Sequence, residues 1–272
     1  MARVEAFAGD PVNGGADPTG LPRVRGLGGA AGGAAAAAVS RAPDVEVGPG
    51  GLARDRCLPV LPALEALVPG RGLRRGATVG VGAAPGVAGA TSLALALAAG
   101  ASQAGSWVAA IGLGSLGLVA AAELGVALER LVLVADPGRD REGWAPVVGA
   151  LVDGFDVVLV AAPERFRPAD ARRLVARVRE RGAVLVAVGG DLPGERSPLG
   201  LTVTAARWEG LGHGWGRLEG RRMTVEAGGR GEATRTRRAE LWLPAEGGGV
   251  GAAEALATPI PLQAVRDVGR SA

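Results

Sequence analysis

The sequence predicts an α/β domain in which helices cover a mostly parallel sheet that continues into antiparallel strands. Two observations carry this expectation. Between residues 77 and 188, short apolar runs alternate with segments of helical spacing, joined by short connections. After Gly189 and Gly190 the helical segments stop, and strand-like segments follow that are separated by glycine-rich turns.

The two ends of the chain differ in composition from its middle. Residues 1–53 and 245–272 are rich in Gly, Ala and Pro and show no sustained apolar period, so we expect disordered tails there. The domain is expected to span residues 57–244, which is long enough to bury a sizeable core.

The elements follow in order along this domain. Parallel strands are expected at residues 77–82, 106–113, 130–135, 155–161 and 183–188, and antiparallel strands at 201–208, 217–227 and 237–243. Helices are expected at residues 58–68, 91–104, 118–128, 144–152 and 168–182, with a basic connector at 71–76. The helix at 168–182 has the plainest signals, because Pro168 opens it, one face is apolar and Gly182 closes it.

The charged residues restrict the chemistry. All 30 basic residues are arginine, so no lysine is present to bind phosphate or to act as a general base. The net charge of +3 is small for a dedicated nucleic-acid binder. Cys57 has no second cysteine to pair with, which suits a reducing cytoplasm, and we expect a small buried side chain there. The N-terminus lacks the pattern of a secretion signal.

Residues 76–122 carry no formal charge, which raises the question of a membrane span. Pro85 and several glycines interrupt this stretch, and it alternates strand-like with helix-like pieces. Buried parallel strands flanked by buried helices give the same signal, so we expect no membrane segment.

A degenerate phosphate-binding loop lies inside this uncharged stretch. Ala84, Gly89 and Thr91 fit the loop pattern, but Ala90 stands where the lysine belongs. Two interpretations stay open for Gly86, Gly89, Ala90 and Thr91. Either their backbone N–H groups still hold an anion, or the loop is vestigial and only lets the strand and helix pack.

The C-terminal strands interleave arginine with tryptophan. We expect an interaction surface there, which either stacks on single-stranded bases or is an ordinary solvated strand face; its residues are Arg207, Trp208, Arg217, Arg221 and Arg222. Acidic residues dilute its charge, so any DNA binding should be weak. His213 is the single histidine and has no cysteine or acid cluster near it, so no metal or catalytic role is expected.

The order of these elements resembles the ATPase core of RecA recombinases. More closely, the chain resembles the RecA-like accessory proteins of actinobacterial mutasomes, the ImuA-prime family, which is related to SulA. The similar segments are residues 61–82, 90–113, 118–134, 156–160, 167–186 and 201–212. The resemblance implies a RecA-like core with a mostly parallel sheet flanked by helices.

The resemblance also implies where an active ATPase would carry its acids, at the ends of the second and fourth strands. Residues 111–115 contain no acid, Val160 and Ala161 end the fourth strand, and Asp156 lies at its wrong end. Since lysine and both acids are missing, we expect a pseudo-ATPase that has no catalytic residue, cofactor or metal.

By resemblance, the function would be a non-catalytic adaptor of DNA-damage-induced (SOS) error-prone translesion synthesis. Its partner would be an inactive Y-family polymerase, and the protein would be cytoplasmic and nucleoid-associated when in complex. Two alternatives stay open: a divergent DNA-dependent RecA-family ATPase in which Arg74 or Arg75 replaces the lysine, and a SulA-type cell-division inhibitor. We expect no filament, because the N-terminal segment offers no obvious apolar helix for one.

Overall fold

The computed structural model describes residues 56–134, 141–161, 166–211 and 215–253. For residues 141–143 it describes the backbone alone. The chain divides into two units, Met1–Ala42 and Pro43–Ala272, and every described residue belongs to the second unit. The tail predicted at residues 1–53 therefore lies outside the described residues, as do His213 and residues 254–272 of the tail predicted at 245–272. Residues 245–253 of that tail are described.

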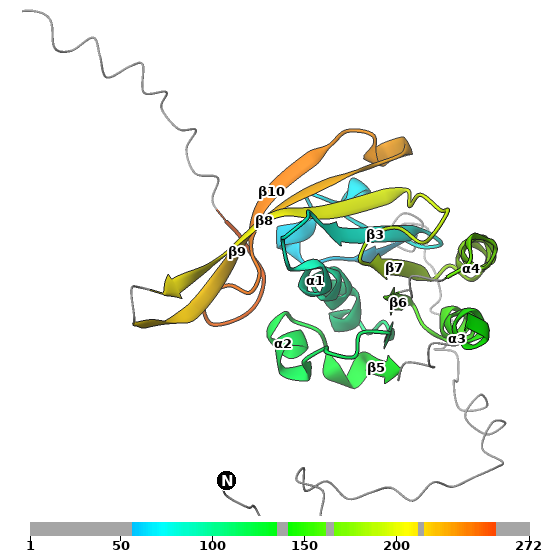
Figure 1. Ribbon diagram of the computed structural model, residues 1–272, viewed down its shortest axis with the longest axis horizontal. Helices are drawn as coiled ribbons and strands as arrows, with labels where there is room; N and C mark the ends of the chain where they lie inside the picture. Colours follow the sequence, from blue (N-terminus) through cyan, green and yellow to red (C-terminus); the bar gives the residue numbers. More distant parts are fainter. Residues whose placement is uncertain (1–55, 135–140, 162–165, 212–214, 254–272) are drawn as a thin grey trace, which may run out of the picture. The chain divides into compact units, whose positions relative to one another are not determined.

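A nine-stranded sheet forms the centre of the second unit (Figure 1). Its strands lie in the order β11-β10-β9-β8-β3-β7-β6-β4-β5. Their bounds are β3 Thr78–Ala83, β4 Val108–Ile111, β5 Leu131–Val134, β6 Val157–Val160, β7 Val184–Val188, β8 Leu199–Leu211, β9 Gly216–Gly229, β10 Arg237–Trp242 and β11 Gly251–Ala252.

The sheet changes from parallel to antiparallel at β8. Strands β3 to β7 pair in parallel, and β8 joins β3 in the same direction. Strands β9, β10 and β11 then pair antiparallel. The predicted fold class is thereby confirmed: an α/β domain with a mostly parallel sheet and antiparallel C-terminal strands.

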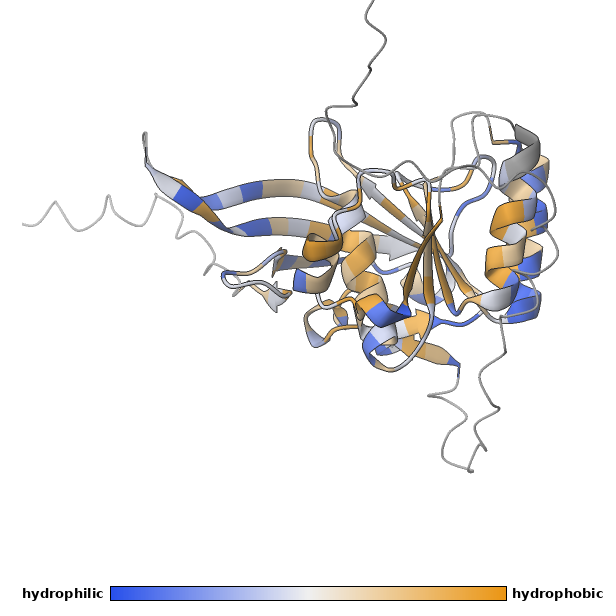
Figure 2. Cartoon of the chain, turned by 90° about the horizontal axis from the view of Figure 1, so that it is seen from below, coloured by the Kyte–Doolittle hydropathy of each residue, from blue (hydrophilic) through white to orange (hydrophobic). Residues whose placement is uncertain are grey.

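Helices cover both faces of the parallel part of the sheet (Figure 2). Their bounds are α1 Ala90–Gln103, α2 Leu118–Glu123, α3 Arg141–Gly154 and α4 Pro168–Arg181. The alternation of side chains along each strand divides the core between these faces. In β6, Val157 and Leu159 pack on the side of α1, whereas Val158 and Val160 pack on the side of α3 and α4.

Helix α1 is the buried helix of the domain, because residues 93–102 are all buried. Its Ala and Leu side chains are small enough to be covered on both sides. The outer cover includes β1 (Cys57–Pro59), which pairs with β2 (Gly72–Arg74) as a separate small sheet. Gly100 permits this cover, since a Cβ there would lie 2.6 Å from the backbone carbon of Val60.

Helix α4 has the capping predicted from its sequence. Pro168 is in its first turn, and Gly182 ends the helix in the left-handed conformation at φ 71°. Its buried residues, Ala171, Leu174, Val175 and Val178, form the predicted apolar face.

Two sequence predictions about the cover of α1 are wrong. The α-helix expected at residues 58–68 is replaced by β1 and a 3-10 turn, η2 (Pro62–Leu64). The prolines explain the difference, because Pro62 fixes the backbone where the turn begins and the N–H of Leu67 bonds three residues back, to Leu64. The connector expected at 71–76 follows a further 3-10 turn, η3 (Pro69–Arg71), and contains strand β2.

Two other bounds also differ from the expected ones. Helix α2 ends at Glu123 rather than near residue 128, where the 3-10 turn η4 (Leu128–Arg130) precedes β5. The sheet continues past the expected domain end at residue 244, because β11 pairs with β10. No helix among the described residues is long and apolar enough to cross a membrane.

Candidate functional site

The degenerate phosphate loop lies where its sequence pattern predicted, between β3 and α1. The N–H of Ala84 bonds to the carbonyl oxygen of Val203 at 2.9 Å, which ties the start of the loop to β8. Gly86 and Gly89 have positive φ values of 77° and 130°, which other residues rarely adopt. Helix α1 begins directly after the loop, and no side chain caps its N-terminus.

Strand β9 fills the space beside the loop. A Cβ at Gly89 would lie 2.4 Å from Cε of Met223, a residue with no solvent exposure. It would also lie 3.8 Å from Nη2 of Arg221. Gly89 is therefore required for the packing of β9 against the loop, whether or not an anion binds.

Arg221 brings a positive charge close to this loop from inside the fold. Only 9% of the residue is exposed, its Nε donates to the carbonyl oxygen of Leu243 at 2.9 Å, and its guanidinium lies over the ring of Trp208. Burial lowers the pKa of Arg221 from its ordinary value. The sequence prediction placed Arg221 on an exposed surface, and that is wrong.

The described ends of the second and fourth parallel strands in chain order carry no acid. Gly112, Leu113, Gly114 and Ser115 follow β4, and Ala161 follows β6. Glu164 and Asp136 lie outside the described residues. No group of three or more His, Cys, Asp or Glu residues with metal-binding geometry occurs among the described residues.

Asp156 and Arg75 lie at the opposite edge of the sheet from the loop. Asp156 precedes β6 and accepts hydrogen bonds from the backbone N–H of Trp107 and from Arg75, both at 3.0 Å. Arg74 and Arg75 precede β3, whereas the loop follows it. The alternative in which either arginine replaces the missing lysine is therefore wrong in its geometry.

The predicted interaction surface lies on the hairpin formed by β8 and β9. This hairpin projects beyond the rest of the sheet (Figures 1 and 2), and its exposed large apolar residues are Trp208, Leu211, Trp215 and Leu218. Trp215 is the most exposed of them, at 76%. Arg207 and Arg217 are exposed on the same hairpin.

Side chains on the same face of the sheet hold Arg222 in place. Its guanidinium lies 4.9 Å from the ring centre of Trp242 and forms ion pairs with Glu209 at 3.5 Å and Glu240 at 4.0 Å. These partners compete with a nucleic-acid base or phosphate for Arg222. Of the five predicted surface residues, Arg207, Trp208 and Arg217 are thus the exposed ones.

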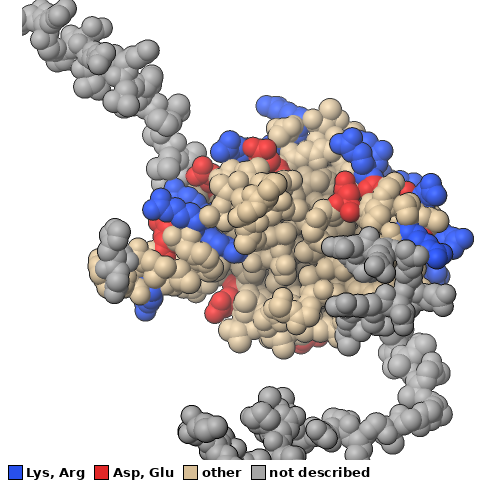
Figure 3. All heavy atoms as spheres, in the orientation of Figure 1, with Lys and Arg blue, Asp and Glu red and all other residues tan. Residues whose placement is uncertain are grey.

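The hairpin borders a broad uncharged surface. Figure 3 shows the face that carries α1 and α2 as largely uncharged, with arginines gathered beside the hairpin and on the side of α4. Leu118 and Val119 of α2 are exposed within the uncharged sequence 76–122. A surface of this kind is typical of protein contact rather than of binding to polyanions.

The chain is similar in sequence to "Uncharacterized protein Rv3395c" of Mycobacterium tuberculosis. The two are 37% identical over 159 residues, which cover 56% of this chain and 74% of the mycobacterial protein. The chain belongs to the family of this protein. Residues 66–194 also match the family described as the MT3502 N-terminal domain. This matched range contains the degenerate loop and the described helices α1, α2, α3 and α4.

A solved structure shows the fold relationship. The RadB recombinase has a TM-score of 0.51 to this chain at 15% sequence identity, over 71% of this chain and 97% of RadB. The RecA-like fold predicted from the sequence is confirmed by this likeness. At this level of identity it shows the fold alone.

The contact of Met223 and Arg221 with the loop was missed from the sequence. A cavity beside Cys57 was also missed. Cys57 was expected to be a small buried side chain, but it is half-buried and lines that cavity. The pairing of distant segments creates both features, so no local sequence pattern predicts them.

Proposed function

We propose that this protein is a non-catalytic RecA-like adaptor of DNA-damage-induced error-prone translesion synthesis, the role that resemblance to the ImuA-prime family implies. Its partner would be an inactive Y-family polymerase. The protein would act in the cytoplasm as a docking subunit for this polymerase. It would associate with the nucleoid only as part of the complex with the polymerase.

One observation carries the non-catalytic part of this proposal. Ala90 stands where the lysine of a phosphate loop would be, and the loop glycine before it is packed against Met223. Phosphoryl transfer relies on positioned charges, and the uncharged stretch 76–122 supplies none to the loop. Arg221 lies nearest, but it bonds to Leu243 and stacks on Trp208.

The adaptor part is supported by the surface around the loop. Trp215, Leu218 and Leu211 expose apolar area at the end of the β8–β9 hairpin, which projects from the body of the domain (Figure 1). Tryptophan is enriched among the residues that carry binding energy in protein interfaces. We assign the partner contact to this hairpin end.

A phosphate-release assay with single-stranded DNA tests the non-catalytic part. We expect no release of phosphate from ATP above a protein-free control. Slow but DNA-dependent release that is abolished by replacing Thr91 with Ala would instead establish the RecA-family ATPase alternative.

A binding experiment with the Y-family partner from the same organism tests the adaptor part. We expect the full chain to retain the partner in a pull-down, and the double variant Trp215→Ala, Leu218→Ala to weaken binding about tenfold or more. Arg172→Ala, an exposed change on α4, serves as the control with unchanged binding. Absence of any association of the wild-type chain would refute the proposed function.

A further inference from the structure

A cavity lies at the other end of β8 from the hairpin tip. There, β1, β2 and the start of β3 enclose this cavity of about 490 Å³ together with the 3-10 turn η5 (Gly231–Ala233). Strand β8 has 13 residues, so this cavity is roughly 40 Å from the hairpin tip. The two surfaces are therefore independent of each other.

The floor of the cavity is apolar. It is formed by side chains that are almost completely buried: Val68, Leu73, Val79, Leu199 and Ala233. A cavity of this size and lining is in the range that ligands occupy. An apolar cavity alone can be a packing defect. Whether this one is suited to a ligand therefore depends on the polar groups that line its opening.

Three arginines and one acid line the mouth. They are Arg74 from β2, Arg179 from α4, Arg230 beyond β9, and Glu232. Arg230 donates to the carbonyl oxygen of Arg196. Arg74 and Arg179 form no ion pair and no hydrogen bond through their side chains with any described residue, so their charge is available to a ligand.

A second depression adjoins this cavity, and Arg74 and Arg179 line both. It has a volume of about 400 Å³ and also shares Ala77 and Pro198 with the cavity, and Arg75 lines it as well. Arg75 is already bound to Asp156. The two adjoining depressions together form a groove, and Arg74 and Arg179 line both of them.

We propose that this groove binds an extended segment of a protein partner in which acidic residues alternate with branched apolar residues. The apolar side chains would enter the cavity between β2 and β8, because burial there removes them from water. The carboxylates would meet Arg74 and Arg179, whose planar guanidinium groups bind carboxylates with two parallel hydrogen bonds. Two adjoining depressions of about 490 and 400 Å³ offer room for consecutive side chains of an extended peptide.

The chain contains its own reporter for this site. Cys57 lines the cavity, and it is the single cysteine of the protein. A bound segment would shield its thiol from a chromogenic reagent such as DTNB. The rate of thiol modification therefore measures occupancy without any added label on the protein.

The experiment uses the full chain and a fluorescein-labelled peptide of alternating Asp and Val. We expect saturable binding by fluorescence anisotropy and a slower reaction of Cys57 in the presence of the peptide. Arg74→Gln and Arg179→Gln should each weaken binding about tenfold, the range for a charge-assisted hydrogen bond. Arg172→Gln is the matched control, since Arg172 is also exposed on α4 but lines neither cavity.

A second peptide with Asn in place of Asp tests the charge without altering the protein. We expect its binding to the wild-type chain to be weaker by a similar factor. Equal binding of both peptides, or no saturable binding of the acidic one, would overturn the proposal. Protection of Cys57 by decanoate but not by the acidic peptide would also overturn it, in favour of a small amphiphilic anion.

Discussion

At the scale of single residues, the closest backbone approach in the described cover of α1 is at Gly100. A Cβ at this position would lie 2.6 Å from the backbone carbon of Val60, 2.7 Å from its Cα and 2.9 Å from the backbone nitrogen of Leu61. These atoms belong to backbone and cannot rotate away as a flexible side chain would. The missing side chain of Gly100 therefore sets how closely α1 and the segment after β1 can pack.

We expect Gly100→Ala to lower the free energy of unfolding by about 1–2 kcal/mol. Alanine gains about 1 kcal/mol of helix propensity over glycine, but overpacking a rigid contact costs about 1–3 kcal/mol or more. Urea unfolding at constant m value measures the difference. Gly114→Ala is the control, because no atom lies within 4 Å of its added Cβ. A Gly100→Ala variant as stable as the wild type would contradict this account.

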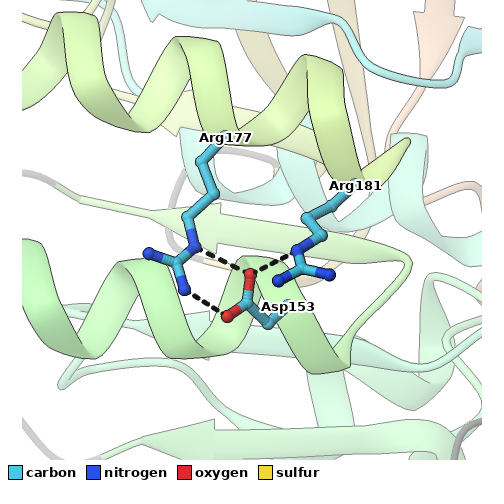
Figure 4. A network of polar contacts seen from close by, with 3 residues as sticks. All are labelled: Asp153, Arg177 and Arg181. Atoms are coloured by element: carbon cyan, nitrogen blue, oxygen red, sulfur yellow. Dashed lines mark hydrogen bonds and ion pairs between the residues drawn. The ribbon is translucent and has the colours of Figure 1, made fainter.

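At the scale of elements, one carboxylate joins helices α3 and α4. Asp153 of α3 accepts hydrogen bonds from Nε of Arg177 at 2.7 Å and Nε of Arg181 at 3.0 Å, and Nη2 of Arg177 bonds to its other oxygen (Figure 4). The two arginines are four residues apart, so α4 presents them on one face. The hydrogen bonds from Arg177 and the charges of both arginines lower the pKa of Asp153 from its ordinary value.

The lowered pKa of Asp153 fixes the direction of its pH dependence. Its contribution to stability is complete above the pKa of the unfolded chain, about 4, and is lost as the pH falls through the lower pKa of the folded state. We expect Asp153→Asn to cost about 0.5–1 kcal/mol at pH 7, since the pair is largely solvated.

Chemical denaturation of both proteins at pH 7 and below pH 4 measures this effect. The difference between wild type and Asp153→Asn should shrink as the pH falls below 4. Glu129→Gln is the control, because Glu129 is exposed and makes no ion pair with a described residue. A difference that is the same at both pH values would mean that the charge of Asp153 does not stabilise the helix pair.

At the scale of the whole domain, the sequence predicted what depends on local pattern. The unbroken apolar runs at Val157–Val160 and Val184–Val188 indicated parallel strands, and the signals around Pro168 and Gly182 indicated α4. The degenerate loop was also predictable, because its glycines follow a strand directly. In residues 58–68 the apolar spacing fits an α-helix and a 3-10 turn equally, and the sequence reading underestimated Pro62.

The side on which Arg221 lies depends on long-range pairing. Trp208 pairs with Arg221 and Arg207 with Arg222, so the two pairs lie on opposite faces of the hairpin. Arg221 lies on the same face as Met223, which packs in the core cluster with α1. The register shifts between Val203 and Ala205, and a shift of one residue exchanges the two faces of a strand. Arg221 and Arg222 are neighbours in one strand, so alternation alone already places them on opposite faces. Only the choice of which one faces the core depends on the long-range pairing, and the sequence prediction of one shared surface overlooked the alternation.

The edges of the sheet lead to a prediction about assembly. Within the described residues, the terminal strands β5 and β11 have four and two residues, and short edges disfavour pairing between chains. The longer free edges of the described sheet, residues 204–211 of β8 and 216–220 of β9, lie on the projecting hairpin. Leu133 is exposed on β5, but adding a strand of this length buries much less than the roughly 1,200 Å² of a stable interface. We expect a monomer in size-exclusion chromatography with light scattering. A larger assembly that Leu133→Lys dissociates would show instead that β5 pairs between chains.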